Sequence, residues 1–373
     1  MKVLSVIKKA INPQGWPGVL GGLAIFVASL GWMDAAFAHE AWVLTPDEMA
    51  EWNARPLPDL FVHLSWKNTM LSLLGVGVVS AWLVVGRTRA VRQMLPGVQA
   101  ALDRLSPFSP FAVRIGLGVM LGMAAFGLSP RFGTGMFEAA TLVAPDLELR
   151  RLPINLEWMA WLEAYAAVTL LLGVYVRLAA LLVLALDLLG LALFGYDMLA
   201  YAGIVAAGPV YLLVTGAGRL ALPMPSILQS IKPASSGLSP ALGLLFARLS
   251  MGLNFIYLGI EYKFRHANLS MAFIENDHVY TFGLEPATFV FCMFMVETAA
   301  GILMVAGSML RLLAIVLLAA FIFMSYALHE SPIGHIIVYG LLFAFFVQRG
   351  ARASAVAQTA RQQVASAAAH QAS

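Results

Sequence analysis

Residues 297–311 read ETAAGILMVAGSMLR, and the same arrangement occurs earlier in the chain, where residues 163–177 read EAYAAVTLLLGVYVR. A second matching pair lies upstream, RIGLG at 114–118 and RLSMG at 248–252. Five positions recur at an offset of 134 (248 − 114, 297 − 163, 311 − 177): Arg114, Gly118, Glu163, Gly173 and Arg177 match Arg248, Gly252, Glu297, Gly307 and Arg311. Burying a charge in lipid costs at least ~2.5 kcal/mol, so charges are the residues that an apolar chain should least repeat by accident. The pattern predicts a membrane protein built from two like halves.

Composition supports a membrane location. The chain has 373 residues, of which 60% are hydrophobic and 12% charged, whereas soluble domains carry about 25% charged residues. The single cysteine, Cys292, excludes an internal disulfide framework and a Cys-x-x-Cys redox pair. The net charge of +3 is modest and the basic residues are scattered, so nucleic acid is not expected as a partner.

Residues 1–38 have the features of a signal peptide or an uncleaved anchor helix. Three lysines precede an apolar run at 19–30, and residues 36–38 read AFA, an A-x-A cleavage pattern. Cleavage after Ala38 would make His39 the first mature residue. Either way, the chain from His39 onward is expected to emerge in the periplasm.

Nine further apolar segments predict membrane-spanning α-helices, because lipid leaves no partner for the backbone of an open chain and no barrel strands are recognisable. They cover residues 69–86, 110–129, 156–175, 178–195, 197–216, 241–260, 286–307, 312–328 and 333–348. The Lys/Arg bias orients them with the N-terminal mature segment outside. We therefore expect a multi-pass protein of the bacterial inner (cytoplasmic) membrane.

The predicted fold is all-α, a polytopic transmembrane helical bundle of two parallel-duplicated four-helix units with an N-terminal signal segment and one extra helix. Residues 39–109 hold a periplasmic segment, the extra helix and a cytoplasmic linker. The units cover 110–218 and 241–348, and a cytoplasmic tail covers 349–373. Four spans are an even number, so both units enter the membrane in the same orientation, unlike the inverted repeats of many transporters.

Two motifs resemble the DoxX/DoxD family of bacterial membrane proteins. Arg-x-x-x-Gly opens the first helix of each predicted unit, and Glu-x9-Gly-x3-Arg covers the second helix and the turn after it. The resemblance covers about 111–195 and, more fully, 245–325, where Gly259 and Lys263 fit the family's glycine–lysine ending to the first helix. The first copy departs here, with Gly127 but no lysine before Arg131. The resemblance implies a four-helix membrane unit often tied to quinone-linked or sulfur-linked redox chemistry, including thiosulfate:quinone oxidoreductase, and many members are accessory subunits.

Four buried charges are the candidate catalytic residues: Glu297, Glu163, Arg248 and Arg114. A carboxylate within the hydrocarbon should be neutral or have a partner, and the arginine on the preceding helix of each half is the expected partner. The four either form one helix-locking salt bridge per half, or one glutamate serves a proton path or a quinone headgroup. We expect Glu297 to be the more functional, because its half has the fuller motif and more histidines.

Six histidines map to the predicted periplasmic side: His39, His63, His266, His278, His329 and His335. Imidazole is the commonest side-chain ligand of transition metals and carboxylates can complete such a shell, so His329, Glu330 and His335, with His266 or His278, form a candidate metal site. A separate candidate uses His39, through its α-amino nitrogen and imidazole, with His63. The candidate cofactor-binding residues are His335, His329, Glu330 and Lys263. Ordinary polar loop residues, or a proton-handling or quinol-oxidising site at the outer surface, remain alternatives.

The region between the predicted spans at 241–260 and 286–307 is interpreted as a loop, Glu261–Glu285. Aromatic residues near the outer face are interpreted as an interfacial belt: Trp42, Trp52, Trp66, Trp158, Trp161, Tyr262, Tyr280 and Phe282.

The chain has no P-loop and no dinucleotide fingerprint, so quinone or a partner subunit is expected to bring the redox centre. The leading hypothesis is an inner-membrane subunit of a quinone-linked oxidoreductase that couples a periplasmic donor, with a sulfur compound as one candidate, to the quinone pool. The expected partners are the lipid bilayer, quinone and a periplasmic partner subunit. The alternative is a non-catalytic membrane protein that handles a metal ion or small solute, or that assembles a periplasmic redox enzyme. A third possibility is a scaffold in a larger complex.

Overall fold

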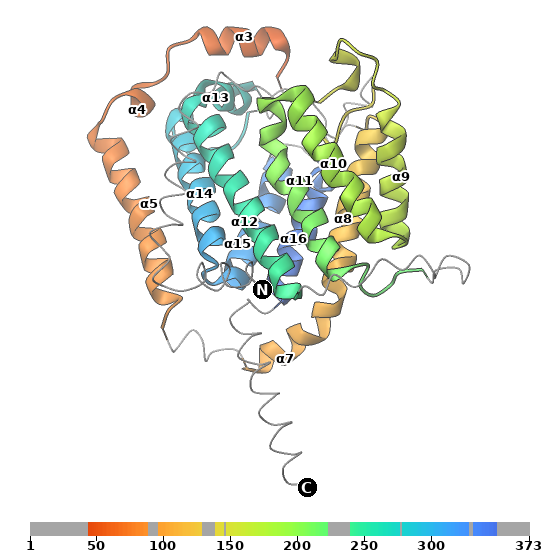
Figure 1. Cartoon of the computed structure of the whole chain (residues 1–373). Coiled ribbons are helices and arrows are strands. Elements are labelled where there is room, and N and C mark those ends of the chain that lie inside the picture. Colours follow the sequence, from red (N-terminus) through yellow and green to blue (C-terminus); the bar gives the residue numbers. More distant parts are fainter. Residues whose placement is uncertain are drawn as a thin grey trace, which may run out of the picture. The chain divides into compact units, whose positions relative to one another are not determined.

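The computed structural model describes residues 44–88, 96–128, 139–144, 147–222, 239–276, 278–327 and 331–348, all within one compact unit, Phe37–Ser373. In these residues the elements are α-helices with short 3-10 segments and one π-helix, and no β-strand forms (Figure 1). The predicted all-α class is confirmed. The signal segment, His39 and the tail after 348 lie outside the described residues.

All nine predicted spans coincide with helices. They are α5 (Trp66–Val85), α8 (Ser109–Ala125), α9 (Met159–Leu172), α10 (Val176–Phe194), α11 (Tyr196–Thr215), α12 (Pro240–Leu258), α14 (Pro286–Ala306), α15 (Leu310–Ala327) and α16 (Ile336–Val347). Six helical segments of the described chain are long and apolar enough to cross a membrane, and α9, α15 and the segment Pro332–Val347 are shorter apolar helices. The chain is a multi-pass membrane protein.

The turns after α9 and α14 have the same backbone form. Each helix ends at a glycine in the left-handed region, Gly173 at φ 75° and Gly307 at φ 64°. Two residues later the chain again has positive φ, 51° at Tyr175 and 46° at Met309. Glycine adopts this conformation without steric cost, so it ends each helix and lets the chain reverse.

The eight helices from α8 to α16, apart from the short α13, pack as two interlocked sets. Within the sets, α8 packs on α9, α10 on α11, α12 on α14 and α15 on α16. Between the sets, α11 packs along α12 and α8 along α16 (Figure 1). Small residues make the α8–α16 crossing close, since a Cβ at Gly116 would lie 2.6 Å from the Ile336 carbonyl oxygen. A polar contact joins the other pair, because the Asn254 carboxamide bonds the α11 backbone at Ala200 O (2.8 Å) and Ile204 N (3.1 Å).

Four further elements are short, and the sequence did not predict them as helices. They are α3 (Pro46–Ala54), α4 (Asp59–Val62), α13 (Ala267–Asn276) and the π-helix η6 (Gly259–Arg265), which continues α12. The expected loop Glu261–Glu285 is therefore largely helical, because the apolar residues of α13 cover a core. The remaining elements are α7 (Pro96–Leu105), η3 (Ser106–Phe108), η4 (Leu149–Arg151) and η7 (Pro332–His335).

The segment α3–α4 packs on α13 and α14. Trp52 and Phe61 are buried in one core cluster with Leu269 and Phe291, and the rings of Phe61 and Phe291 lie 5.7 Å apart. A capping box begins α3, and hydrogen bonds from the Thr45 backbone N–H and then its hydroxyl lower the pKa of the partly exposed Glu48.

Two of the predicted belt aromatics are core residues instead. Trp52 is 8% exposed and Tyr262 is fully buried, so the belt interpretation is wrong for both. Trp52 packs in one core cluster with α13, and the Tyr262 ring lies edge-on to the ring of Tyr257 on α12. The rings of Trp66, Trp158, Trp161, Tyr280 and Phe282 are exposed as expected, and Trp42 lies outside the described residues.

The extra helix α5 lies along α14. Near the start of α5, Lys67 Nζ forms an ion pair with Oε2 of Glu285, the residue before α14, at 3.0 Å. Near its end, Trp82 Nε1 donates a hydrogen bond to the carbonyl oxygen of Ser308, just after α14, at 3.2 Å. The helix has no buried residue along its length, so it covers α14 without entering the bundle.

Candidate functional site

A cavity of about 410 Å³ lies among α11, α12, α14, α15 and α16. Most of its wall is apolar, with phenylalanine, methionine and aliphatic side chains. Six side chains with polar or reactive groups line it: Glu297, Lys263, His335, Tyr201, Ser270 and Cys292. The structure therefore brings three residues predicted from the sequence, Glu297, Lys263 and His335, to one site.

Glu297 contributes the carboxylate of this cavity. It lies in the middle of α14, and its Oε2 is buried with no hydrogen-bond partner among the described residues. The Lys263 ammonium interacts electrostatically with it. Because Glu297 lines the cavity, its carboxylate can accept a hydrogen bond from an occupant.

The π-helix η6 positions Lys263. Gly259 lets η6 approach α14 closely, because a Cβ there would lie 2.5 Å from Thr298 Oγ1, one residue beyond Glu297. Lys263 follows on the same element, 8% exposed, with its Nζ 3.2 Å from Ser270 Oγ. The Ser270 hydroxyl in turn donates to Tyr262 O at 3.1 Å. π-Helical turns are frequent at functional sites. Here the π-helix directs Lys263 into the cavity, whereas the sequence had predicted this lysine in an outer loop.

His335 ends η7 and leads into α16. Its ring lies 5.1 Å from the ring of Phe321 on α15, and it lines the cavity. Tyr201 on α11 lines the same cavity and lies at the matching position of the first half (335 − 134). The helix packing thus brings a tyrosine and a histidine from the two halves to one space.

The cavity reaches the outer surface of the bundle between α14 and α15. Val296 on α14 and Phe323 on α15 both line it, and they are 60% and 41% exposed. In a membrane these two side chains would face lipid. An apolar tail could therefore extend from the cavity into the bilayer.

Glu163 lies behind the wall of the cavity instead of lining it. It is fully buried, and its Oε1 accepts a hydrogen bond from Val143 N at 2.7 Å. Val143 has φ 53°, and Val143 and Ala144 form part of the cavity wall. Glu163 therefore holds in place a segment of chain that closes one side of the cavity.

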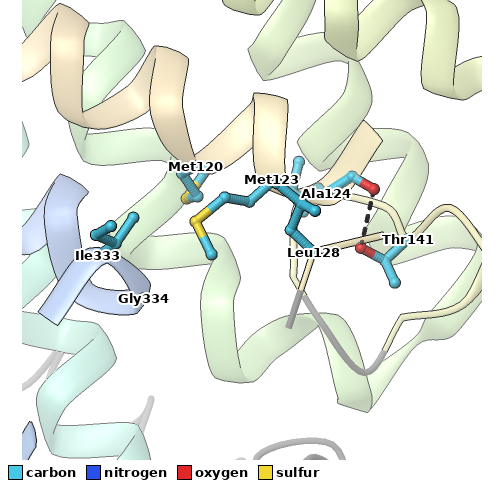
Figure 2. A pocket seen from close by; sticks show the side chains of 8 residues that line it. Met120, Met123, Ala124, Leu128, Thr141, Ile333 and Gly334 are labelled. Atoms are coloured by element: carbon cyan, nitrogen blue, oxygen red, sulfur yellow. Dashed lines mark hydrogen bonds between the residues drawn. The ribbon is translucent and has the colours of Figure 1, made fainter. Parts of the chain in front are cut away.

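A second, much smaller cavity of about 30 Å³ adjoins the first (Figure 2). The two share Met120, Val143 and Gly334 in their walls. Thr141 is bonded to Ala124 at the end of α8, with a distance of 3.4 Å from its Oγ1 to the carbonyl oxygen (Figure 2). The small cavity has room for about one water molecule, so it is a packing gap beside this wall.

The predicted pairing of Arg114 with Glu163 is wrong. Arg114 is fully buried and donates to the carbonyl oxygens of Leu170 (2.7 Å), Leu171 (2.6 Å) and Leu220 (2.6 Å). Glu163 lies seven residues before Leu170 (170 − 163), about 10 Å along the helix. The last carbonyls of a helix lack partners and carry partial negative charge, so they take the guanidinium in place of the glutamate.

The same argument holds for Arg248 and Glu297. A Cβ at Gly307 would overlap the guanidinium of Arg248, which places this arginine at the end of α14. Glu297 lies ten residues earlier in the helix (307 − 297), about 15 Å away. Arg114 therefore caps the end of α9, Arg248 lies at the corresponding end of α14, and neither lines the cavity.

The other histidines have separate surroundings. His63 is exposed, with its Nε2 3.9 Å from Asp59 Oδ1, and His266 Nε2 lies 3.4 Å from Glu261 Oε1. His278 follows α13 in a turn with φ 50°. His39, His329 and Glu330 lie outside the described residues. Within the described ranges no group of three or more His, Cys, Asp or Glu could hold a metal ion, so the metal sites stay predictions that depend on those three residues.

Sequence reasoning did not select Tyr201, Cys292 or Val143 as site residues. Tyr201 had a signal, because it occupies the position that matches His335. Cys292 and Val143 had none, since their place in the wall follows from helix packing and from the path of a loop.

Comparison with known proteins connects the second half of the chain to a family. The model of the DoxX family matches residues 243–330, which include Lys263, Cys292 and Glu297. No curated protein and no solved structure matches the chain.

Proposed function

From the DoxX domain at residues 243–330 as the premise, we propose that this membrane protein is a subunit of a quinone-linked oxidoreductase and that its cavity binds the quinone headgroup. The observation that supports this is the gathering of Glu297, Lys263 and His335 in an apolar cavity among membrane-spanning helices. Its volume of about 410 Å³ lies in the range of sites for small organic ligands.

The chemistry of the wall fits a quinone. Its ring is flat and apolar, which suits the phenylalanine and methionine side chains, and its carbonyl oxygens need hydrogen-bond donors. Lys263 and His335 carry N–H donors, and Tyr201 carries a hydroxyl. The opening between Val296 and Phe323 would let the isoprenoid tail lie in the bilayer.

The residues have distinct roles in this proposal. Reduction of a quinone to a quinol takes two electrons and two protons, and a donor carried by a periplasmic partner subunit would supply the electrons. Lys263 and His335 would orient the ring, and Glu297 would exchange a proton at the near oxygen of the ring. Glu163, Arg114 and Arg248 would support the bundle, since Glu163 lies behind the wall and the arginines cap helices.

The one cysteine of the chain offers a direct test, because Cys292 lines the cavity. Purified protein in nanodiscs is alkylated with a small maleimide in the presence of a fully substituted short-chain quinone. We expect the quinone to slow alkylation of Cys292 in a saturable way. The control is Cys292→Ala/Ser80→Cys, in which the thiol lies on an exposed part of α5 and should react at the same rate with and without quinone.

An alkylation rate that does not change up to saturating quinone would refute the proposed function. Equal slowing of the control variant would do the same, because it would show that the quinone acts through the bilayer. The variants Lys263→Met and His335→Phe should each shift the protection curve to higher quinone concentration.

A further inference from the structure

Glu163 and Glu297 occupy equivalent places on their helix pairs. A Cβ at Gly118 would lie 3.1 Å from Ala167 O, and one at Gly252 would lie 3.0 Å from Gly301 O. The two contacts are related by the 134-residue offset (252 − 118, 301 − 167). The pair α8–α9 therefore packs in the same register as α12–α14.

The helix-capping arginines obey the same offset. The guanidinium of Arg114 lies beside Gly173, with Cζ 3.0 Å from an ideal Cβ, and that of Arg248 lies beside Gly307. Because contacts on both sides of the glutamates match, the two glutamates have equivalent backbone positions relative to the preceding helix.

The two halves then differ in what reaches the carboxylate. In the first half the chain after α8 turns back, and the Val143 N–H donates to Glu163 Oε1 at 2.7 Å. Two backbone hydrogen bonds brace this turn, Thr141 N to Ala124 O (3.1 Å) and Leu142 N to Leu147 O (2.8 Å).

In the second half the chain after α12 takes another path, through η6 and α13. Glu297 lines the cavity, and no backbone N–H of the described residues is bonded to it as Val143 N is to Glu163. Its Oε2 is buried without a partner among these residues, as Glu163 Oε2 also is. The segment that donates to Glu163 has no counterpart bonded to Glu297, which lies in the cavity wall instead.

We propose that an occupant of the cavity donates an O–H hydrogen bond to Glu297, as the Val143 N–H does to Glu163. This rests on the proposed function and deepens it, because a quinone has only acceptor oxygens whereas a quinol has hydroxyl donors. The site therefore binds the quinol more tightly than the quinone. By linkage, such a site favours reduction of a quinone that is bound in it.

The test compares three compounds of one ring in the Cys292 protection assay under anaerobic conditions: the short-chain quinone, its quinol, and the dimethyl ether of the quinol. The ether keeps the shape of the quinol but has no O–H. We expect the quinol to protect Cys292 at a concentration about ten- to hundredfold lower than the other two compounds, the range of a hydrogen bond to a charged group.

Variants assign this preference to the carboxylate. In Glu297→Leu the quinol should lose its advantage while the quinone still protects, and in Glu297→Gln, which keeps a carbonyl acceptor, part of the advantage should remain. The matched control is Glu163→Gln at the equivalent position, which should keep the full preference because Glu163 lies behind the wall. Cys292 in each variant must remain alkylated without ligand, which shows that the cavity is still formed.

The outcomes separate the two proposals. Protection by none of the compounds contradicts the quinone site itself. Equal protection by quinone, quinol and ether in the unaltered protein overturns the O–H donation while leaving the quinone site intact. A preference for quinol that persists in Glu297→Leu also overturns it, because the donor would then have another acceptor.

Discussion

Replacing Arg114 by methionine should destabilise the protein without touching the cavity. The guanidinium is fully buried and donates three hydrogen bonds of 2.6–2.7 Å to carbonyl oxygens, two at the end of α9 and one at Leu220. At about 1.5 kcal/mol for each bond, the lower end of the range for hydrogen bonds to charged groups, their loss predicts a fall of about 4.5 kcal/mol in the free energy of unfolding. Methionine keeps much of the apolar volume of the stem, so cavity formation adds little.

The assay is denaturant unfolding in mixed micelles, followed by loss of helical circular dichroism. A matched control is Arg150→Met, because Arg150 makes an exposed ion pair with Glu157 at 3.1 Å. An exposed pair contributes about 0–1 kcal/mol, so the control should unfold almost as the unaltered protein does. Arg114→Lys should fall between the two, since an ammonium cannot reproduce the planar fork of donors.

The result that would refute this reasoning is an unfolding free energy for Arg114→Met within about 1 kcal/mol of the Arg150→Met control, the largest contribution expected from an exposed pair. It would mean that the carbonyls at the end of α9 find water or other donors at no cost. If the double variant Arg114→Met/Glu163→Leu were more stable than Arg114→Met alone, the two charges would interact electrostatically although they form no ion pair.

Three further substitutions test the local geometry, the first two in the same unfolding assay and the third by amide hydrogen exchange. Glu163→Leu leaves the buried Val143 N–H without an acceptor and should lower stability by about 1–3 kcal/mol, whereas Glu163→Gln should be much closer to the unaltered protein. Gly173→Ala should lose more stability than Gly283→Ala, because both glycines have positive φ but only at Gly173 would a Cβ lie 2.8 Å from a backbone atom. Equal losses of stability would mean that only backbone strain, about 1–2 kcal/mol, acts at both positions and would contradict the steric argument. Asn254→Leu removes two hydrogen bonds to the α11 backbone and should speed amide hydrogen exchange in α11, and unchanged exchange there would contradict this role.

The membrane-spanning helices could be predicted from the sequence because the signal is local. A run of about 20 apolar residues is enough to identify a span, whatever it packs against. The short helices α3 and α13 have no such run, and they form because their apolar faces cover one another. One of them did carry a readable signal, since Thr45-Pro-Asp-Glu48 has the spacing of a capping box.

The partners of the buried charges could not be predicted in the same way. The sequence shows that Arg114 and Glu163 both lie in apolar helices, and opposite charges in lipid favour a pair. It does not show at which depth the arginine meets the next helix. The structure places Arg114 at the helix end, where the carbonyl oxygens of Leu170 and Leu171 accept its hydrogen bonds, and charge alone does not predict this arrangement.

The repeated charges and the unrepeated ones thus have different meanings. The arginines have the same surroundings in both halves, at a glycine that ends the next helix, so their recurrence reflects a shared way of closing a helix pair. The glutamates recur as well, but Glu163 is bonded by the chain itself, while Glu297 faces a cavity with Lys263 and His335. Lys263 and His335 are not repeated in the first half, where the matching positions are Ser129 (263 − 134) and Tyr201 (335 − 134). Glu163 thus accepts a backbone hydrogen bond in a closed part of the bundle, whereas Glu297 lies in the wall of a cavity that can hold a ligand. We therefore expect substitutions at Glu163 to change stability before binding, and substitutions at Glu297 to change binding before stability.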